Sequence, residues 1–123
     1  MADDAFRDRR ILIVEDESII AEELEESFAE IGAVVVGPVP SIDRALELIA
    51  ATPRIDAALI DVSLDGELAY PVIDALEARN VPFVLMSGYE DHVLRSRYPR
   101  ARNCQKPYEF ADIKRALVAA LPG

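Results

Sequence analysis

The sequence predicts one α/β domain, in which a mostly parallel sheet carries helices on both faces. Short apolar runs without polar alternation recur along the chain, which is typical of strands buried on both sides. Amphipathic segments with apolar residues three or four positions apart lie between these runs. The chain has 123 residues, of which 51% are apolar, and this is enough for a single core. Because crossovers between parallel strands are right-handed, the alternation predicts a doubly wound sheet of five strands.

The first half of the chain alternates two strands with two helices. Residues 11–14 are apolar and mostly β-branched, which predicts a central strand. Residues 18–31 follow as an amphipathic helix. Residues 33–37 are the second expected strand, which Pro38 and Pro40 should break before the next helix. Ser41 is a good N-cap for the helix that comes next.

The third strand leads directly into an acidic residue. Residues 57–60 are apolar throughout, and Asp61 follows them at once. Residues 63–67 include a glycine and are expected to form a loop. A helix over residues 71–79 completes this unit.

The last two strand–helix units are less regular. Residues 81–86 predict the fourth strand, whose proline lies near its start and is tolerable there. Residues 89–100 are charged and poorly periodic, so we expect a short or frayed helix. Residues 101–105 are the fifth strand by position, and residues 110–121 form the closing helix.

Composition narrows the function classes. The net charge of −10 disfavours binding to nucleic acid or to an anionic membrane by this chain alone. Cys104 is the single cysteine and cannot form an internal disulfide, and the polar opening has no signal-peptide core. We therefore expect a cytoplasmic location, with a short extension over residues 1–9 and one domain over residues 10–121.

Polar residues follow four of the expected strands. Glu15 and Asp16 come after the first strand, Asp61 after the third, Ser87 after the fourth and Lys106 after the fifth. In an open α/β sheet, ligands bind at this carboxyl edge of the strands. Each of these residues, taken alone, is explained as an ordinary turn residue. Their occurrence at the ends of four strands, in the order acid, acid, hydroxyl and lysine, is harder to explain in that way. Three carboxylates gathered there would repel one another unless a cation neutralised them, which predicts a metal.

Oxygen ligands with room for water suit Mg²⁺. We expect Asp16 and Asp61 to bind the ion directly and Glu15 to hold one of its waters. The backbone carbonyl of Ser63 is a further candidate ligand.

The same residues fit phosphoryl transfer, which needs an in-line nucleophile and neutralised oxygens. Asp61 would be the carboxylate nucleophile. Mg²⁺, the Lys106 ammonium and the Ser87 hydroxyl would each bind one oxygen of the transferred group.

This set of residues resembles that of the response-regulator receiver domains of two-component signalling, over residues 10–121. The resemblance implies a flavodoxin-like (βα)5 fold with strand order 2-1-3-4-5, and phosphorylation by a histidine kinase or phosphotransfer protein. The family's acidic pair matches Glu15 and Asp16, and its phosphorylated aspartate matches Asp61. Its hydroxyl residue matches Ser87, and its lysine matches Lys106. The proline after that lysine, whose peptide bond is typically cis in the family, matches Pro107.

A narrower resemblance is to the FATGUY subgroup of receivers, through residues 82–89. Many members are stand-alone regulators, so the output would be contact with a downstream protein. The chain departs from ordinary receivers at Asn103, where a tyrosine or phenylalanine usually relays phosphorylation to the binding face. We therefore expect Ser87, Gly88 and Tyr89 to act as the switch, by ordering on phosphorylation.

Two other functions compete with this interpretation. A receiver-like module could bind partners without phosphorylation, although the complete set of site residues argues against that. A haloacid-dehalogenase-like phosphatase also uses a strand-end aspartate and Mg²⁺. It would need a second acid two residues after the nucleophile, where this chain has Ser63.

Overall fold

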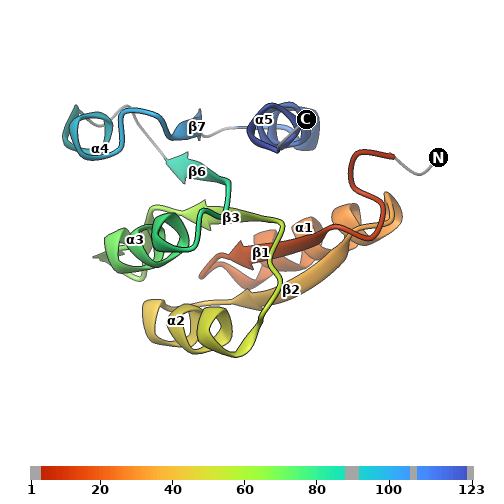
Figure 1. Cartoon of the computed structure of the whole chain (residues 1–123), viewed down its shortest axis with the longest axis horizontal. Coiled ribbons are helices and arrows are strands. Elements are labelled where there is room, and N and C mark those ends of the chain that lie inside the picture. Colours follow the sequence, from red (N-terminus) through yellow and green to blue (C-terminus); the bar gives the residue numbers. More distant parts are fainter. Residues whose placement is uncertain (1–3, 88–91, 106–107, 122–123) are drawn as a thin grey trace.

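Five parallel strands form the central sheet in the order β2-β1-β3-β6-β7, as the computed structural model shows (Figure 1). The structure describes residues 4–87, 92–105 and 108–121. The strands of this sheet are β1 (Arg10–Val14), β2 (Val34–Val39), β3 (Ala57–Asp61), β6 (Phe83–Ser87) and β7 (Arg102–Gln105). When these five strands are numbered by their order in the chain, they lie side by side in the order 2-1-3-4-5, which is that of a doubly wound sheet. The predicted fold class is therefore confirmed.

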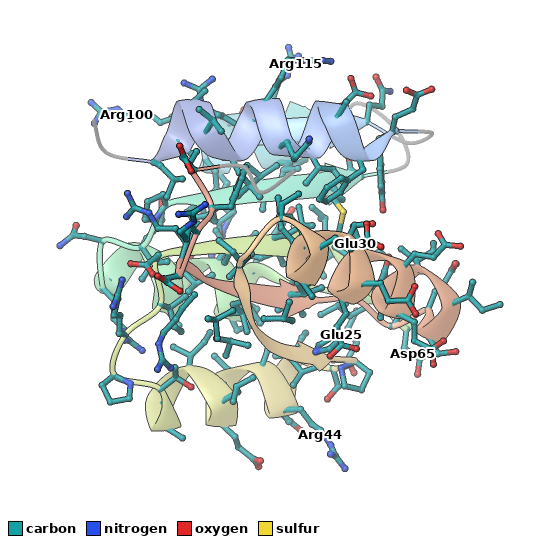
Figure 2. All side chains as sticks on the ribbon, turned by 90° about the vertical axis from the view of Figure 1, so that its right-hand side faces the viewer. Glu25, Glu30, Arg44, Asp65, Arg100 and Arg115 are labelled. Carbon is teal, nitrogen blue, oxygen red and sulfur yellow. The ribbon has the colours of Figure 1, made fainter. Side chains whose placement is uncertain are left out.

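Helices cover both faces of this sheet (Figure 1). Helices α1 (Ser18–Glu30) and α5 (Phe110–Ala120) lie on one side. Helices α2 (Ile42–Ala51), α3 (Tyr70–Ala78) and α4 (His92–Arg97) lie on the other. The expected alternation of strands and helices is therefore present, with bounds that differ from the prediction by one or two residues at most ends. Exposed charges line the outer surface, among them Glu25 and Glu30 on α1, Arg44 on α2 and Arg115 on α5 (Figure 2).

Each face of the sheet has its own apolar core. On the α2–α3–α4 side, Leu12 and Ile60 of the sheet pack with Ile73 and Leu76 of α3. On the α1–α5 side, the sheet packs against α1, α5 and Phe6, and the largest fully buried side chains there are Phe6, Phe28, Ile11, Ile13, Leu59, Met86 and Ile113. The two layers fix the sheet rigidly between helices, so the carboxyl edge of the strands is held in place.

Phe6 belongs to this core although residues 1–9 are predicted to lie outside the domain. Its side chain is 0% exposed. Its ring meets that of Phe28 edge to face, with 5.9 Å between the ring centroids. The Asp8 backbone N–H donates to the Gly32 carbonyl at 2.9 Å. Phe6 and Asp8, which precede β1, are therefore part of the packed domain.

The second strand extends two residues beyond its predicted end, because β2 continues through Pro38 to Val39 and ends directly before Pro40. β2 is an edge strand, so its outer side needs no partner and the missing N–H of proline is tolerated. The pairing register with β1 shifts between Leu12 and Val14, and Gly37–Pro38 is a cis peptide. The extension lets the Val39 carbonyl accept the Glu15 backbone N–H at 3.0 Å, at the start of the acidic pair.

Residues expected to form a loop after Asp61 form a small hairpin instead. Strand β4 (Ser63–Leu64) pairs antiparallel with β5 (Glu67–Leu68). The two turn residues between them have positive φ, 50° at Asp65 and 83° at Gly66. An Asp-Gly pair favours this type of two-residue turn, because both positions tolerate the left-handed conformation. The hairpin carries the Asp65 backbone toward the acidic residues.

The short helix and the weak strand expected near the end of the chain are both present, as α4 and β7. A buried tyrosine links the end of α4 to α3. The Tyr98 hydroxyl donates to Asp74 Oδ1 at 2.7 Å and accepts from Arg97 Nε at 2.9 Å. Arg97 also pairs with Asp74 and lies over the Tyr70 ring, 4.7 Å from its centroid.

A length and hydropathy test of the described helices finds none that could cross a membrane. The cytoplasmic location stays a prediction.

Candidate functional site

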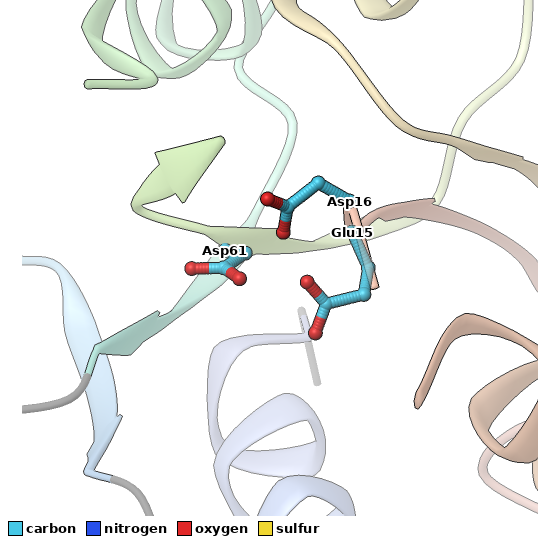
Figure 3. Close-up of side chains that lie close together, drawn as sticks. All are labelled: Glu15, Asp16 and Asp61. Atoms are coloured by element: carbon cyan, nitrogen blue, oxygen red, sulfur yellow. The ribbon is translucent and has the colours of Figure 1, made fainter. Parts of the chain in front are cut away.

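Three carboxylates meet at the carboxyl edge of β1 and β3. Glu15 and Asp16 follow β1, and Asp61 is the last residue of β3. The two strands are paired, with Val14 opposite Ile60, so their ends lie side by side. One oxygen from each carboxylate lies within 4.8 Å of the others, and the three groups point toward one another (Figure 3). The predicted clustering of these residues is therefore present.

The cluster is largely shielded from solvent. Glu15 is 1% exposed and Asp61 is 4% exposed, whereas Asp16 is half-buried. Burial strengthens the repulsion between carboxylates because little water screens them. The open side of the cluster is therefore at Asp16.

Backbone N–H groups of the β4–β5 hairpin orient two of the carboxylates. The Ser63 N–H donates to Asp61 Oδ1 at 3.1 Å, and the Asp65 N–H donates to Asp16 Oδ2 at 2.8 Å. Hydrogen bonds to ionised oxygens are stronger than neutral ones, so they hold the ionised side chains in position. The hairpin thus fixes the geometry of the site.

The donor set fits a hard divalent cation. All three ligand groups are carboxylates, and such oxygens suit Mg²⁺ or Ca²⁺ rather than a soft metal. A cation would also relieve the crowding of negative charge among Glu15, Asp16 and Asp61. The assignment of the Ser63 carbonyl as a further ligand stays a prediction.

Ser87 lies at the carboxyl end of β6, next to Asp61. Asp61 is paired with Met86, so Ser87 is one residue beyond the partner of Asp61. The residue is 8% exposed. This placement is the one expected for a hydroxyl group near the strand-end carboxylate.

Asn103 of β7 contacts this hydroxyl, and the sequence gives no sign of that contact. Its Nδ2 lies 2.9 Å from Ser87 Oγ and its Oδ1 lies 3.1 Å from the same oxygen. Asn103 is paired with Leu85, two residues before Ser87, so the side chains of Asn103 and Ser87 lie on one face of the sheet. This contact requires the pairing register between β6 and β7, which is known only from the folded sheet.

Tyr108 is a second residue whose surroundings the sequence does not show. Its hydroxyl is buried and has no hydrogen-bond partner among the described residues. Burial, with added repulsion from the charges of Glu15 and Asp61, raises the pKa of Tyr108 well above its usual range. The phenol therefore stays protonated near the carboxylate cluster. Its position two residues after Lys106 is the one signal in the sequence.

Four predicted site residues lie outside the residues that the structure describes. They are Gly88 and Tyr89 of the expected switch, the expected phosphate-binding Lys106, and Pro107 with its expected cis bond. Their roles stay predictions.

Comparisons with known proteins place the chain next to bacterial signalling proteins. SdrG from Sphingomonas melonis Fr1 is 38% identical in a match that covers 94% of this chain and 97% of that one, with a TM-score of 0.77. The PhyR response-regulator REC domain of Erythrobacter litoralis is 25% identical, over 93% of this chain and 90% of that one, with a TM-score of 0.79.

A curated relative is the phyllosphere-induced regulator PhyR of Methylorubrum extorquens. It is 29% identical over 114 residues, which are 90% of this chain and 43% of that protein. The chain thus spans less than half the length of this relative. No protein-family model matches the sequence.

Proposed function

The chain belongs to the response-regulator receiver domains, the phosphorylation-accepting modules of two-component signalling, and we propose that Asp61 is its phospho-acceptor. The observation that carries this assignment is the position of Asp61 at the end of β3. Its carboxylate is 4% exposed and lies with those of Glu15 and Asp16 within 4.8 Å. A backbone N–H from Ser63 donates to Oδ1 of this carboxylate at 3.1 Å and so orients the group that would attack phosphorus.

Receiver domains bind Mg²⁺ at an acidic pocket, and in this chain Glu15, Asp16 and Asp61 would hold it. When bound, the ion neutralises negative charge on the carboxylates and on the phosphoryl oxygens. The half-buried Asp16 lies at the open side, where the ion and its waters would enter. Glu15 is the most deeply buried of the three acids and would orient a water rather than the ion itself.

The remaining phosphoryl oxygens need donors from the chain. Ser87 lies at the end of the neighbouring strand β6, and its hydroxyl can donate to one oxygen. Lys106 directly follows β7 in the sequence, and its ammonium is the donor we assign to another. With these groups the domain would support its own phosphorylation and dephosphorylation, without acting on a separate substrate.

We assign the phosphoryl donor to a phosphohistidine on a histidine kinase or phosphotransfer protein, and the output to contact with a downstream protein. The motif over residues 82–89 supports membership of the FATGUY subgroup. The net charge of −10 supports a protein partner rather than nucleic acid or a membrane.

A haloacid-dehalogenase-like phosphatase mechanism would lack its second acid in this chain. The place of the second acid, two residues after Asp61, is held by Ser63. Ser63 is exposed in β4, and its backbone N–H already serves the Asp61 carboxylate. A general acid would be missing there.

Phosphorylation by a small donor tests the assignment of Asp61. Incubation with acetyl phosphate and Mg²⁺ should add one phosphoryl group to the wild type, as measured by intact mass. Asp61→Ala should abolish the gain, because the nucleophile is removed. Asp43→Ala, which removes an exposed carboxylate on α2, is the matched control and should be phosphorylated like the wild type. If neither acetyl phosphate nor a histidine kinase phosphorylates the wild type, the phosphorylation-independent binding module becomes the better explanation.

A further inference from the structure

Ser87 and Asn103 form a polar pair across the two strands at the β7 edge of the sheet. Both polar atoms of the Asn103 carboxamide lie within hydrogen-bond distance of Ser87 Oγ, at 2.9 Å for Nδ2 and 3.1 Å for Oδ1. Ser87 is 8% exposed, so little water competes for its hydroxyl. Ser87 lies on β6, the strand next to that of Asp61, and Asn103 lies on β7, one strand farther.

A cavity of about 270 Å³ opens beside this pair. Asn103 lines it together with Leu85 of β6, Leu94 of α4 and Tyr98. An aromatic residue at position 103 would extend toward this space, but the short carboxamide leaves the space open and turns to Ser87 instead. The role of residue 103 here is therefore a hydrogen-bonding one.

We propose that Asn103 is a positioning residue for Ser87: its amide N–H donates to Ser87 Oγ and so directs the single hydroxyl proton toward the phosphoryl group on Asp61. The inference rests on the proposed role of Asp61 as the phospho-acceptor. It assigns to Asn103 a part in holding the phosphoryl group without touching that group.

Counting protons explains why the contact must have this direction. A serine hydroxyl has one proton to donate and two lone pairs to accept with, whereas a carboxamide can both donate and accept. If Ser87 donates to Asn103 Oδ1, that proton is no longer available to a phosphoryl oxygen. If Asn103 Nδ2 donates to Ser87 Oγ, the hydroxyl proton can be given to the phosphoryl group.

Phosphorylation would select the second arrangement. An ionised phosphoryl oxygen is a stronger acceptor than an amide oxygen, because hydrogen bonds to charged groups are stronger. Asn103 can then keep its contact with Ser87 by using Nδ2, which is already at 2.9 Å. No movement of residue 103 is required, in contrast to the swing of an aromatic ring.

Two substitutions separate this role from simple packing. Asn103→Ala removes both hydrogen-bonding atoms. Asn103→Asp keeps the shape of the side chain, but an ionised carboxylate can only accept, so it would take the Ser87 proton away from the phosphoryl group. It also adds a negative charge near that group. If Asn103 acted through shape alone, any loss in the aspartate variant would come from this charge and would persist in the Ser87→Ala background.

A double-mutant cycle with Ser87→Ala tests the route of the effect. The readout is the affinity for beryllofluoride, a phosphoryl mimic, in the presence of Mg²⁺, followed by nuclear magnetic resonance. Loss of one hydrogen bond predicts an affinity about 3-fold to 10-fold weaker for Asn103→Ala. We expect a larger loss for Asn103→Asp. In the Ser87→Ala background, Asn103→Ala should change the affinity little, because the hydroxyl that it orients is gone.

The outcomes distinguish the two proposals. Asn103→Ala and Asn103→Asp proteins that bind beryllofluoride as tightly as the wild type, while Ser87→Ala binds weakly, would overturn the role of Asn103 alone. An equal loss with and without the Ser87 hydroxyl would also overturn it. A wild type that fails to bind, or that binds no better than Asp61→Ala, would instead contradict the proposed function. Thermal unfolding of each variant without beryllofluoride checks that the fold is retained.

Discussion

At the scale of single residues, Gly37 is a position where a side chain would be both strained and crowded. Its φ is +96°, in the left-handed region. A Cβ there would lie 3.0 Å from the Val39 nitrogen and 3.1 Å from the Ile13 carbonyl oxygen, both of which are backbone atoms. Gly66 has a similar φ of +83°, but no atom lies within 4 Å of its Cβ position. The two glycines therefore separate the cost of conformation from the cost of crowding.

Gly37→Ala should destabilise the protein more than Gly66→Ala. The left-handed conformation costs an L-residue about 1–2 kcal/mol at either position. At Gly37 the added crowding against two backbone atoms should bring the loss to roughly 3 kcal/mol. Urea unfolding of the three proteins measures the difference. Equal losses for the two alanine variants would contradict the crowding at Gly37.

The carboxylate cluster is predictable from the sequence because it depends on chain order alone. Glu15, Asp16 and Asp61 each come directly after or at the end of an apolar strand, and the ends of parallel strands share one edge. The contact between Ser87 and Asn103 is not predictable in this way. It depends on the register between β6 and β7, which polar residues of the last strand do not specify.

At the scale of elements, α4 is held in place by its neighbours rather than by its own length. It has 6 residues, and helices this short do not persist alone in water. Leu94 packs into the core, and Tyr98 after the helix is 4% exposed. The hydrogen bond from the Tyr98 hydroxyl to Asp74 ties this segment to α3 at 2.7 Å. The end of α4 is thus the anchored end.

Tyr98→Phe should lower the free energy of unfolding by about 1–2 kcal/mol at neutral pH, because a hydrogen bond to a carboxylate is lost. Tyr70→Phe is the matched control, since within the described part of the chain no hydrogen bond of the Tyr70 hydroxyl is found. Denaturant unfolding of both variants gives the comparison. If Tyr70→Phe lowered the free energy of unfolding as much as Tyr98→Phe, the hydrogen bond from Tyr98 to Asp74 would not be the cause of the loss.

The stability difference between the wild type and Tyr98→Phe should depend on pH in a defined direction. Burial and the hydrogen bond to Asp74 raise the pKa of Tyr98 above its usual 10.0. A group whose pKa is raised on folding contributes stability that is complete below its unfolded pKa and is lost as pH rises through the folded one. The difference should therefore shrink above about pH 10. A constant difference at alkaline pH would contradict the raised pKa.

Most elements are predictable because their apolar spacing is local. Helix α1 shows this, since Leu24 and Phe28 recur at helical spacing and are buried. The errors have longer-range causes. The end of β2 depends on its place at the sheet edge, which makes Pro38 acceptable, and on a shifted register with β1. The β4–β5 hairpin is too short for any periodic pattern to reveal.

At the scale of the whole molecule, an acidic protein concentrates three of its carboxylates at one edge of its sheet. The net charge of −10 already opposes compaction, and the cluster of Glu15, Asp16 and Asp61 adds a local repulsion. A ligand that binds the folded chain alone stabilises it by mass action. The fold as a whole should therefore respond to Mg²⁺.

Mg²⁺ should raise the midpoint of thermal unfolding of the wild type. At a free concentration 100 times the dissociation constant, the stabilisation is about 2.7 kcal/mol. Asp16→Asn should stabilise the metal-free protein, because one negative charge is removed, and should weaken the response to Mg²⁺. Its amide oxygen can still accept the Asp65 N–H.

Two controls isolate binding from screening of charge. Asp43→Asn removes an exposed charge away from the cluster and should keep the full response to Mg²⁺. A monovalent salt at equal ionic strength should raise the midpoint much less. If that salt reproduces the effect of Mg²⁺, the ion is not bound at the cluster.

The burial of Phe6 has a practical consequence for anyone who cuts or extends this protein. The ring belongs to the same core as Phe28 and Phe110, although it comes from the segment before the first strand. A truncated protein that starts at Arg10 would lose the Phe6 side chain from the apolar core on the α1–α5 side. A fusion partner joined close to Phe6 would disturb the packing of that core. Phe6 should therefore be kept, with free space around it, in any shortened or fused form of this protein.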